Sequence, residues 1–187
     1  MANETRVGSP VKAVGGLRSG DIGTPLPTDA VSVLDAALKA LGLIGEDGLS
    51  ESEERSTEDE RAWGGSIART VQTEYGLKVT FTFIERTTAV LQEVRGKDNV
   101  IEEKVAGGTQ RTVLFNSKTL PPRVYVADIK DGDYALRKVY PNAQITEVGE
   151  TQFVHSTLIK YEVTLTAYED EHGNNEYEYD FVPDAAA

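Results

Sequence analysis

Short segments in which apolar and polar residues alternate constrain this fold more than any other feature. In residues 77–83 and 161–167, aliphatic or aromatic residues take every second position, and Lys, Thr or Glu take the positions between. Residues 177–181 repeat the pattern with Tyr and Phe against Glu and Asp. Side chains of a strand point alternately to the two faces of a sheet, so each segment predicts a strand with one buried face.

Turn-forming residues separate further β-prone runs. Asp131-Gly132 favours a two-residue hairpin turn, because both central positions of such a turn need φ > 0. It predicts strands over about 123–130 and 133–140. We expect further turns at Gly107-Gly108 and Asn174-Asn175, and another strand near residues 145–148.

A hairpin is also expected between residues 67–75 and 77–83, turning at Glu74-Tyr75-Gly76. Seven or eight strands with one or two short flanking helices predict a mostly β fold, an antiparallel β-barrel or sandwich. The strand order does not follow from the pattern.

The segment before these strands predicts an arm and a helix. Residues 1–29 are rich in Gly and Pro and poor in large apolar residues, which is typical of a flexible arm that orders on a partner. Residues 30–41 predict a helix, with an apolar stripe at three- and four-residue spacing, a cap at Thr28 or Asp29 and an end at Gly42. We therefore expect an arm over 1–29, a domain over 30–182 and a C-terminal tail over 183–187. A second short helix is expected at about 89–94, ending at Gly96.

The net charge of −12 is concentrated in two segments. Residues 46–60 hold eight acids and one Arg, and residues 169–184 hold seven acids and no base, so the remainder carries +2. Binding to phosphates needs clustered Lys and Arg, so we expect no specific binding of nucleic acid. The two blocks are interpreted either as solvated loops or as surfaces with a specific role.

Signatures of catalysis and of metal binding are weak. The chain has no Cys, and neither His155 nor His172 has a second His at zinc-ligand spacing. Gly64-Gly65-Ser66-Ile67-Ala68 resembles a nucleophile elbow, but a β-prone run follows it where a helix is needed. Asp128-x-x-Asp131-Gly132-Asp133 lacks the spacing of a calcium loop. We expect no catalytic residue, no metal site and no cofactor, and the protein is interpreted as not an enzyme.

Nothing in the sequence predicts export or a membrane span. The N-terminus lacks the basic-then-apolar pattern of a signal peptide, and no apolar run approaches about 20 residues. We therefore expect a chain that is made in the cytoplasm.

An ordered set of segments resembles one known family. Among the matching segments are Gly23–Thr28, Leu41–Leu49, Arg55–Asp59, Ala62–Gly65, Val71–Tyr75, Lys130–Asp133 and Pro141–Gly149. They resemble the major tail tube proteins of long flexible-tailed (siphovirus-type) phages, particularly those that infect actinobacteria. The resemblance extends from Gly23 to Tyr179 and is weakest over residues 96–122.

The resemblance implies a structural virion protein of the phage tail. Such subunits form hexameric rings that stack into a tube, the conduit for DNA ejection, with a β-barrel similar to that of the type VI secretion tube protein. The implied partners are copies of the chain, the tape-measure protein, the tail terminator and distal tail proteins, with double-stranded DNA passing through the lumen without specific binding. The protein is expected in the virion after assembly in the host cytoplasm.

Two sets of residues are candidates for these surfaces. The polar faces of two strands, expected either in the lumen or on the outer surface, are Thr80, Thr82, Glu162, Thr164 and Thr166. The expected contacts between subunits involve Leu17, Ile22, Pro25, Leu26, Leu43, Ile44, Leu49 and Trp63. The alternatives are a monomeric ligand- or glycan-binding β-sandwich module, and another tail component such as a terminator.

Overall fold

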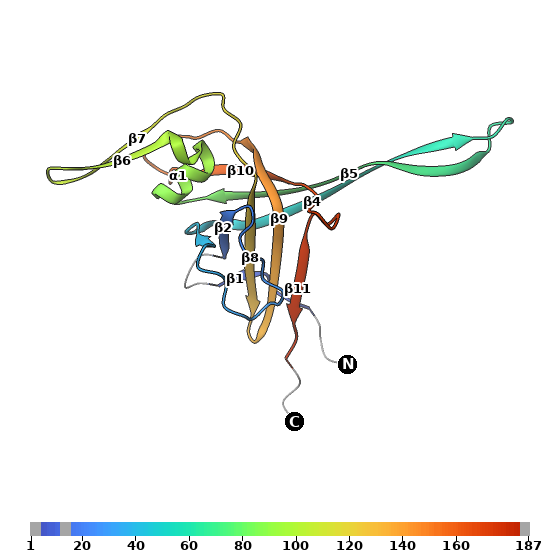
Figure 1. Cartoon of the computed structure of the whole chain (residues 1–187), viewed down its shortest axis with the longest axis horizontal. Helices are drawn as coiled ribbons and strands as arrows, with labels where there is room; N and C mark the ends of the chain where they lie inside the picture. The colour runs from blue at the N-terminus through green and yellow to red at the C-terminus, as the bar shows by residue number, and fades with distance from the viewer. Residues whose placement is uncertain (1–4, 12–15, 184–187) are drawn as a thin grey trace.

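A computed structural model describes residues 5–11 and 16–183, and the description below concerns these residues. Two hairpins, formed by residues 44–83 and 100–113, project from a β-rich body (Figure 1). The elements in chain order are β1 (Ser9–Pro10), β2 (Leu17–Asp21), β3 (Lys39–Ala40), β4 (Ile44–Arg61), β5 (Ile67–Phe83), α1 (Thr88–Arg95), a 3-10 turn (Lys97–Asn99), β6 (Val100–Val105), β7 (Gly108–Val113), β8 (Arg123–Asp131), β9 (Tyr134–Val148), β10 (Tyr161–Ala167) and β11 (Tyr177–Phe181). The mostly antiparallel β fold with a short helix is confirmed.

The strand β9 joins two parts of one antiparallel sheet. The sheet runs β3-β2-β8-β9-β10-β5-β4, with β1 added to β8 and β11 added to β9. The first half of β9, Ala135–Val139, pairs with β11, and the second half, Ala143–Val148, pairs with β10 on the same side. Pro141 lies between the halves, at an irregularity in the pairing with β8. A proline has no N–H to donate and fits such a break in the ladder.

The main core lies between the two parts of this sheet and the helix. The alternating residues of β5 and β10 contribute one face, among them Phe83 and Leu165, and α1 contributes Val90, Leu91 and Val94. The helix begins after Thr87, whose hydroxyl accepts the Val90 N–H, and ends at Gly96, as predicted. Burial of these apolar side chains is the main favourable term for the body.

A buried carboxylate fixes α1 to the sheet. Glu93 on α1 accepts hydrogen bonds from Ser19 of β2 and, at 2.9 Å, from the hydroxyl of Tyr125 on β8. The guanidinium of Arg123 lies 3.2 Å from the same carboxylate. Burial raises the pKa of Tyr125, so its hydroxyl keeps the proton that it donates.

The expectation of a flexible arm over residues 1–29 is wrong for much of that segment. Strand β2 pairs with both β3 and β8, and Leu17 is completely buried in the main core. Glycines serve close packing here: a Cβ on Gly16 would lie 2.8 Å from Pro10 Cβ and 3.0 Å from the Asp128 carbonyl oxygen. Residues 1–4 and 12–15, like residues 184–187 of the expected tail, lie outside the described part.

The helix expected at residues 30–41 is absent, and the segment consists of turns followed by β3. Asp29 accepts the N–H groups of Val31 and Ser32, and Asp35 accepts the N–H of Ala37. Such local bonds give the backbone an alternative to helical pairing. Leu38 is nevertheless buried, in a second cluster on the outer face of β8 and β9.

Two of the other predicted turns are confirmed and one is wrong. The Asp131-Gly132 turn between β8 and β9 and the Gly107-Gly108 hairpin tip are confirmed. The turn expected at Glu74-Tyr75-Gly76 is wrong, because β5 continues through it and Gly76 pairs with Glu54 of β4. The strand expected near 145–148 is the end of β9.

Candidate assembly surfaces

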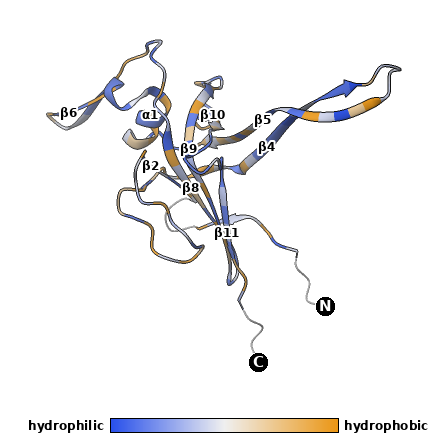
Figure 2. Ribbon diagram, turned by 45° about the vertical axis from the view of Figure 1, so that its right-hand side comes forward, coloured by the Kyte–Doolittle hydropathy of each residue, from blue (hydrophilic) through white to orange (hydrophobic). Residues whose placement is uncertain are grey.

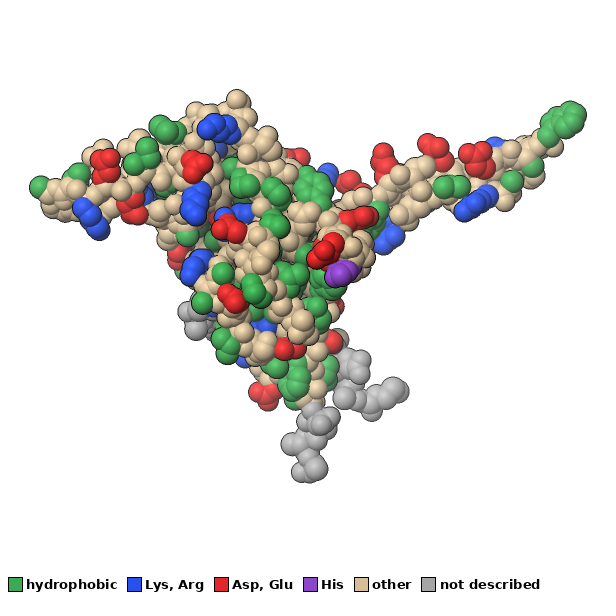
Figure 3. All heavy atoms as spheres, in the orientation of Figure 1, with side chains coloured by type: hydrophobic (Ala, Val, Ile, Leu, Met, Phe, Trp, Pro, Cys, Tyr) green, Lys and Arg blue, Asp and Glu red, His purple; other side chains and the backbone are tan. Residues whose placement is uncertain are grey.

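The β4–β5 hairpin projects far from the body as an isolated two-stranded ribbon (Figure 1). Each residue from 50 to 75 is exposed. At about 3.3 Å per residue, the stretch from Glu54 to the tip at Trp63 is roughly 30 Å long. The first acidic block therefore lies on a strand rather than in a loop, and acidic side chains follow one edge of the ribbon (Figure 3).

The outer ribbon has few stabilising contacts within the chain. Its ion pairs, Arg55 with Glu53 at 3.3 Å, Arg61 with Asp59 at 3.8 Å and Lys78 with Glu54 at 3.7 Å, are solvent-exposed. Exposed pairs of this kind contribute about 0–1 kcal/mol. Apolar positions recur toward the outer end (Figure 2), and Trp63 at the tip is fully exposed. The ribbon thus presents apolar surface that its own chain does not cover.

The five residues predicted for the polar face do lie together. Cross-strand register places Thr82 opposite Glu162 and Thr80 opposite Thr164, with the two threonine hydroxyls 3.2 Å apart. Thr166 adds a hydroxyl contact to Thr146 of β9 at 2.9 Å. This face lies opposite the side of β5 and β10 that packs into the core. The structure therefore assembles the predicted set, and its place in a lumen stays a prediction.

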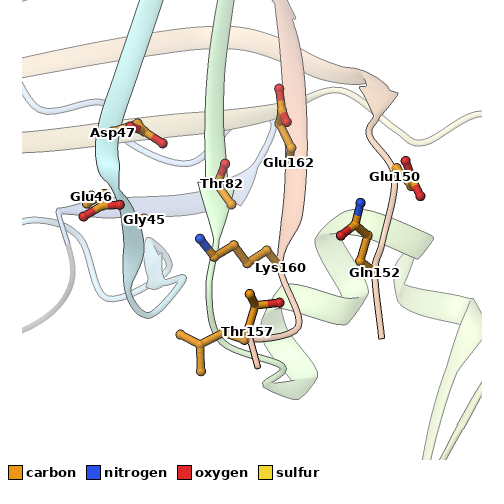
Figure 4. Close-up of a pocket in the computed structure, with 10 residues that line it drawn as sticks. Gly45, Glu46, Asp47, Thr82, Glu150, Gln152, Thr157, Lys160 and Glu162 are labelled. Atoms are coloured by element: carbon orange, nitrogen blue, oxygen red, sulfur yellow. The ribbon is translucent and has the colours of Figure 1, made fainter. Parts of the chain in front are cut away.

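An acidic hollow continues this polar face. Its volume is about 340 Å³, and its walls come from the start of β4, from β5, from β10 and from the segment after β9 (Figure 4). Four carboxylates line it with a single cation; the charged lining residues are Glu46, Asp47, Glu150, Glu162 and Lys160. The net charge of −3 is unfavourable for a phosphate backbone.

A lysine with three carboxylates connects the base of the ribbon to β9 and β11. The Nζ atom of Lys138 lies 2.6 Å from Glu51, 2.9 Å from Glu176 and 2.8 Å from Glu178. Burial alone would lower the pKa of Lys138, but its hydrogen bonds to Glu178, Glu51 and Glu176 outweigh burial and raise it. Tyr140 also donates to Glu51, and burial followed by the Glu51 charge raises its pKa. These contacts bring the base of β4 against β9 and β11 and mark where the supported part of the ribbon ends.

The residues predicted for subunit contacts separate into two groups. Leu17 is completely buried in the chain's own core, so that prediction is corrected; Ile44 and Leu49 are half-buried and pack on the same core. The exposed ones are Ile22, Pro25, Leu26, Leu43 and Trp63.

The Lys138 cluster was not predicted. The signal was present, because an acidic strand such as β11 is stabilised beside a strand that supplies a cation. The register that places Glu178 opposite Lys138 could not be read without the strand order.

Comparison with known proteins identifies the family. A family model described as phage tail tube protein matches residues 2–184, and the chain therefore belongs to the phage tail tube protein family. It is a structural component of a phage tail. No curated protein matches. Among solved structures, the tube-terminating cap of an anti-feeding prophage is similar over 95% of this chain and 96% of that chain, at 10% identity and a TM-score of 0.44.

Two further features of the described residues concern membrane-spanning helices and metal sites. None of their helices is long and apolar enough to cross a membrane. Nor do His, Asp or Glu side chains gather there in a group of three that could hold a metal ion.

Proposed function

We propose that this chain is the major tail tube subunit of a long flexible-tailed phage of the actinobacteriophage type. Copies form hexameric rings, the rings stack into a hollow tube, and DNA leaves the head through it. The subunit works without catalysis or a cofactor. Its partners are other copies, the tape-measure protein, the terminator and distal tail proteins.

The observation that carries this proposal is the exposure of every residue from 50 to 75 in the β4–β5 ribbon. A two-stranded hairpin is marginally stable alone in water. A ribbon of this length therefore gains its order from a neighbouring chain. When the contacting surfaces on two copies differ, the contact is heterologous and either closes a ring or grows a filament. Both outcomes occur in a tube of stacked rings.

The polar face of β5 and β10 suits the lumen wall. It carries hydroxyls and Glu162, and the adjoining hollow adds further carboxylates. A basic wall would release counterions and retain DNA, whereas a neutral or acidic wall lets it slide.

Negative-stain electron microscopy of the concentrated pure protein tests the main proposal. We expect hollow tubes with regular striations. Single rings that do not stack indicate a terminator, and a persistent monomer that binds sugar indicates a glycan-binding module; either result rejects the proposal.

The lumen assignment has its own test. Glu162→Lys in the phage should slow DNA ejection from tails of normal length, because it places a cation in the wall. Glu103→Lys changes the charge equally on the exposed face of β6 and should leave ejection unchanged. Equal kinetics for the two variants would place the polar face outside the lumen.

A further inference from the structure

A groove on the body offers apolar surface that the described residues leave open. Its volume is about 740 Å³, and it lies between the loop after β2, the bend of β9, the loop after β10, and β11. The apolar lining includes Ile22, Leu26, Pro27, Pro141, Tyr177 and Tyr179. The rings of Tyr177 and Tyr179 are stacked, with centroids 6.4 Å apart, and both line the groove.

The rim of this groove is acidic and held in place. Asp170 accepts hydrogen bonds from the Tyr177 hydroxyl at 2.6 Å and from the backbone N–H groups of His172 and Asn174. These bonds lower the pKa of Asp170, so its carboxylate stays charged near neutral pH. The order they impose presents Glu169 and Glu171 at the rim, and both are exposed. In the part of the chain that is described, neither acid takes part in an ion pair.

The ribbon tip has the complementary properties. Trp63 stands in a tight turn closed by hydrogen bonds between Ala62 and Ser66 and between Gly65 and Ala62, with φ positive at both Gly64 and Gly65. The turn therefore projects the exposed indole from the end of the ribbon. Residues 61–73 carry two Arg and no acid, but Arg61 pairs with Asp59, and the acids at 58–60 on β4 lie directly across from residues 69–71. Arg69 forms no ion pair among the described residues.

We propose that the ribbon tip of one copy docks in this groove of a second copy, with Trp63 against Tyr177 and Tyr179 and with Arg69 facing the acidic rim. The inference rests on the proposed function and names the surface that receives the ribbon. The ribbon is paired from its base to its tip, with two register shifts, and extends roughly 30 Å beyond Glu54, which carries its tip away from its own groove. Tip and groove are different surfaces, which makes the contact heterologous. Large aromatic residues that fill pockets dominate the energetics of protein interfaces.

Trp63 is the only tryptophan in the chain, so its fluorescence reports this contact in the wild-type protein. We expect emission at long wavelength and strong acrylamide quenching in the dilute monomer. On assembly the emission should shift to shorter wavelength and the quenching should fall. Tubes in which Trp63 stays solvent-accessible would overturn the inference and leave the proposed function intact.

Disulfide trapping identifies the receiving surface. The chain has no cysteine, so Ala62→Cys combined with Leu26→Cys creates one pair, at the tip and in the groove. Oxidised tubes should give a ladder of cross-linked species on a non-reducing gel. The matched control, Ala62→Cys with Phe153→Cys, places the second thiol at an exposed site outside the groove lining and should give none. Equal ladders, or ladders only in the control, contradict the inference.

The energetic test compares two exposed aromatic residues. Trp63→Ala should raise the critical concentration for assembly about 30-fold, the effect of losing an interface hot spot. Phe153→Ala should leave the concentration unchanged. Equal effects would contradict the docking of Trp63, and failure of the wild type to assemble would reject the proposed function together with the inference that rests on it.

Discussion

Two long hairpins of this chain, β8–β9 and β4–β5, have similar backbone pairing and opposite surroundings. The first is flanked by β2, β10 and β11 and is largely buried. The second is supported only near its base, by β10 and by the contacts of Glu51, and from residue 50 to 75 it is exposed throughout.

The difference shows that strand pairing alone does not decide where a hairpin is stable. The β8–β9 pair is stabilised by apolar burial on both faces, which includes Tyr125 and Tyr140 on one side and Val126 and Val139 on the other. The outer β4–β5 ribbon has exposed ion pairs and an Arg55–Tyr75 contact at 4.5 Å, which are weak in water. The proposed assembly supplies the missing support from another copy of the chain.

The largest difference in the free energy of unfolding is expected between two side-chain truncations to alanine in β5. Phe83→Ala, at the buried end of β5, should lower the free energy of unfolding by about 3–5 kcal/mol, because it leaves a cavity beside Phe81. Val71→Ala, in the outer ribbon, should change it by no more than about 0.5 kcal/mol. Urea unfolding at monomeric concentrations measures both, and similar losses would show that the ribbon is supported within its own chain.

A smaller effect is expected from cations on the two hairpins. Arg137 on β9 is buried, lies 2.6 Å from Asp128 and donates to the carbonyl groups of Asp29 and Ser32. Arg137→Met should cost about 3 kcal/mol, because it leaves Asp128 and two carbonyls without this partner. Arg55→Met on the exposed ribbon should cost at most about 1 kcal/mol. Urea unfolding measures the loss of stability in both variants. Equal losses for Arg137→Met and Arg55→Met would contradict the contrast between the hairpins.

The smallest of the three effects concerns glycines. Gly16→Ala forces a Cβ against Pro10 and the backbone of β8, and should cost about 1–3 kcal/mol. Gly108→Ala at the tip of the projecting β6–β7 hairpin meets no atom within 4 Å and should cost less than about 0.5 kcal/mol. Thermal unfolding compares the two. A tolerated Gly16→Ala would contradict the close packing of this segment against Pro10 and β8.

Local patterns predicted the body better than the ribbon. Strands β10 and β11, helix α1 and the Asp131-Gly132 turn each carry their signal in a few adjacent residues, and all were predicted. The continuation of β5 through Gly76 was not predicted. Nothing packs on this glycine, and a glycine of this kind in a strand has the same local pattern as one in a turn. The acidic residues of β4 have low β propensity, so the sequence did not predict the strand in which they pair with β5.

The N-terminal predictions failed for a different reason. Glycines at positions 16 and 20 were interpreted as flexibility, whereas they permit close approach to Pro10, Leu38 and Thr24. The three- and four-residue spacing of apolar residues in 30–41 was interpreted as a helix, but Asp29 and Asp35 organise turns there. The first error depends on contacts distant in the sequence, and the second on local side-chain bonds that compete with the helical pattern. The five polar residues on β5 and β10 were assembled as expected because alternation fixes the face of each strand.

Hydrogen exchange of the backbone amides in residues 55–73 tests the central claim most directly, when the dilute monomer is compared with the assembled protein. The account predicts fast exchange in the monomer, since the ribbon lacks support there, and strong protection after assembly. The amides of β8 and β9 should be protected in both states. Equal exchange of residues 55–73 in the two states would contradict the claim that the ribbon finds its missing partner on another copy of the chain.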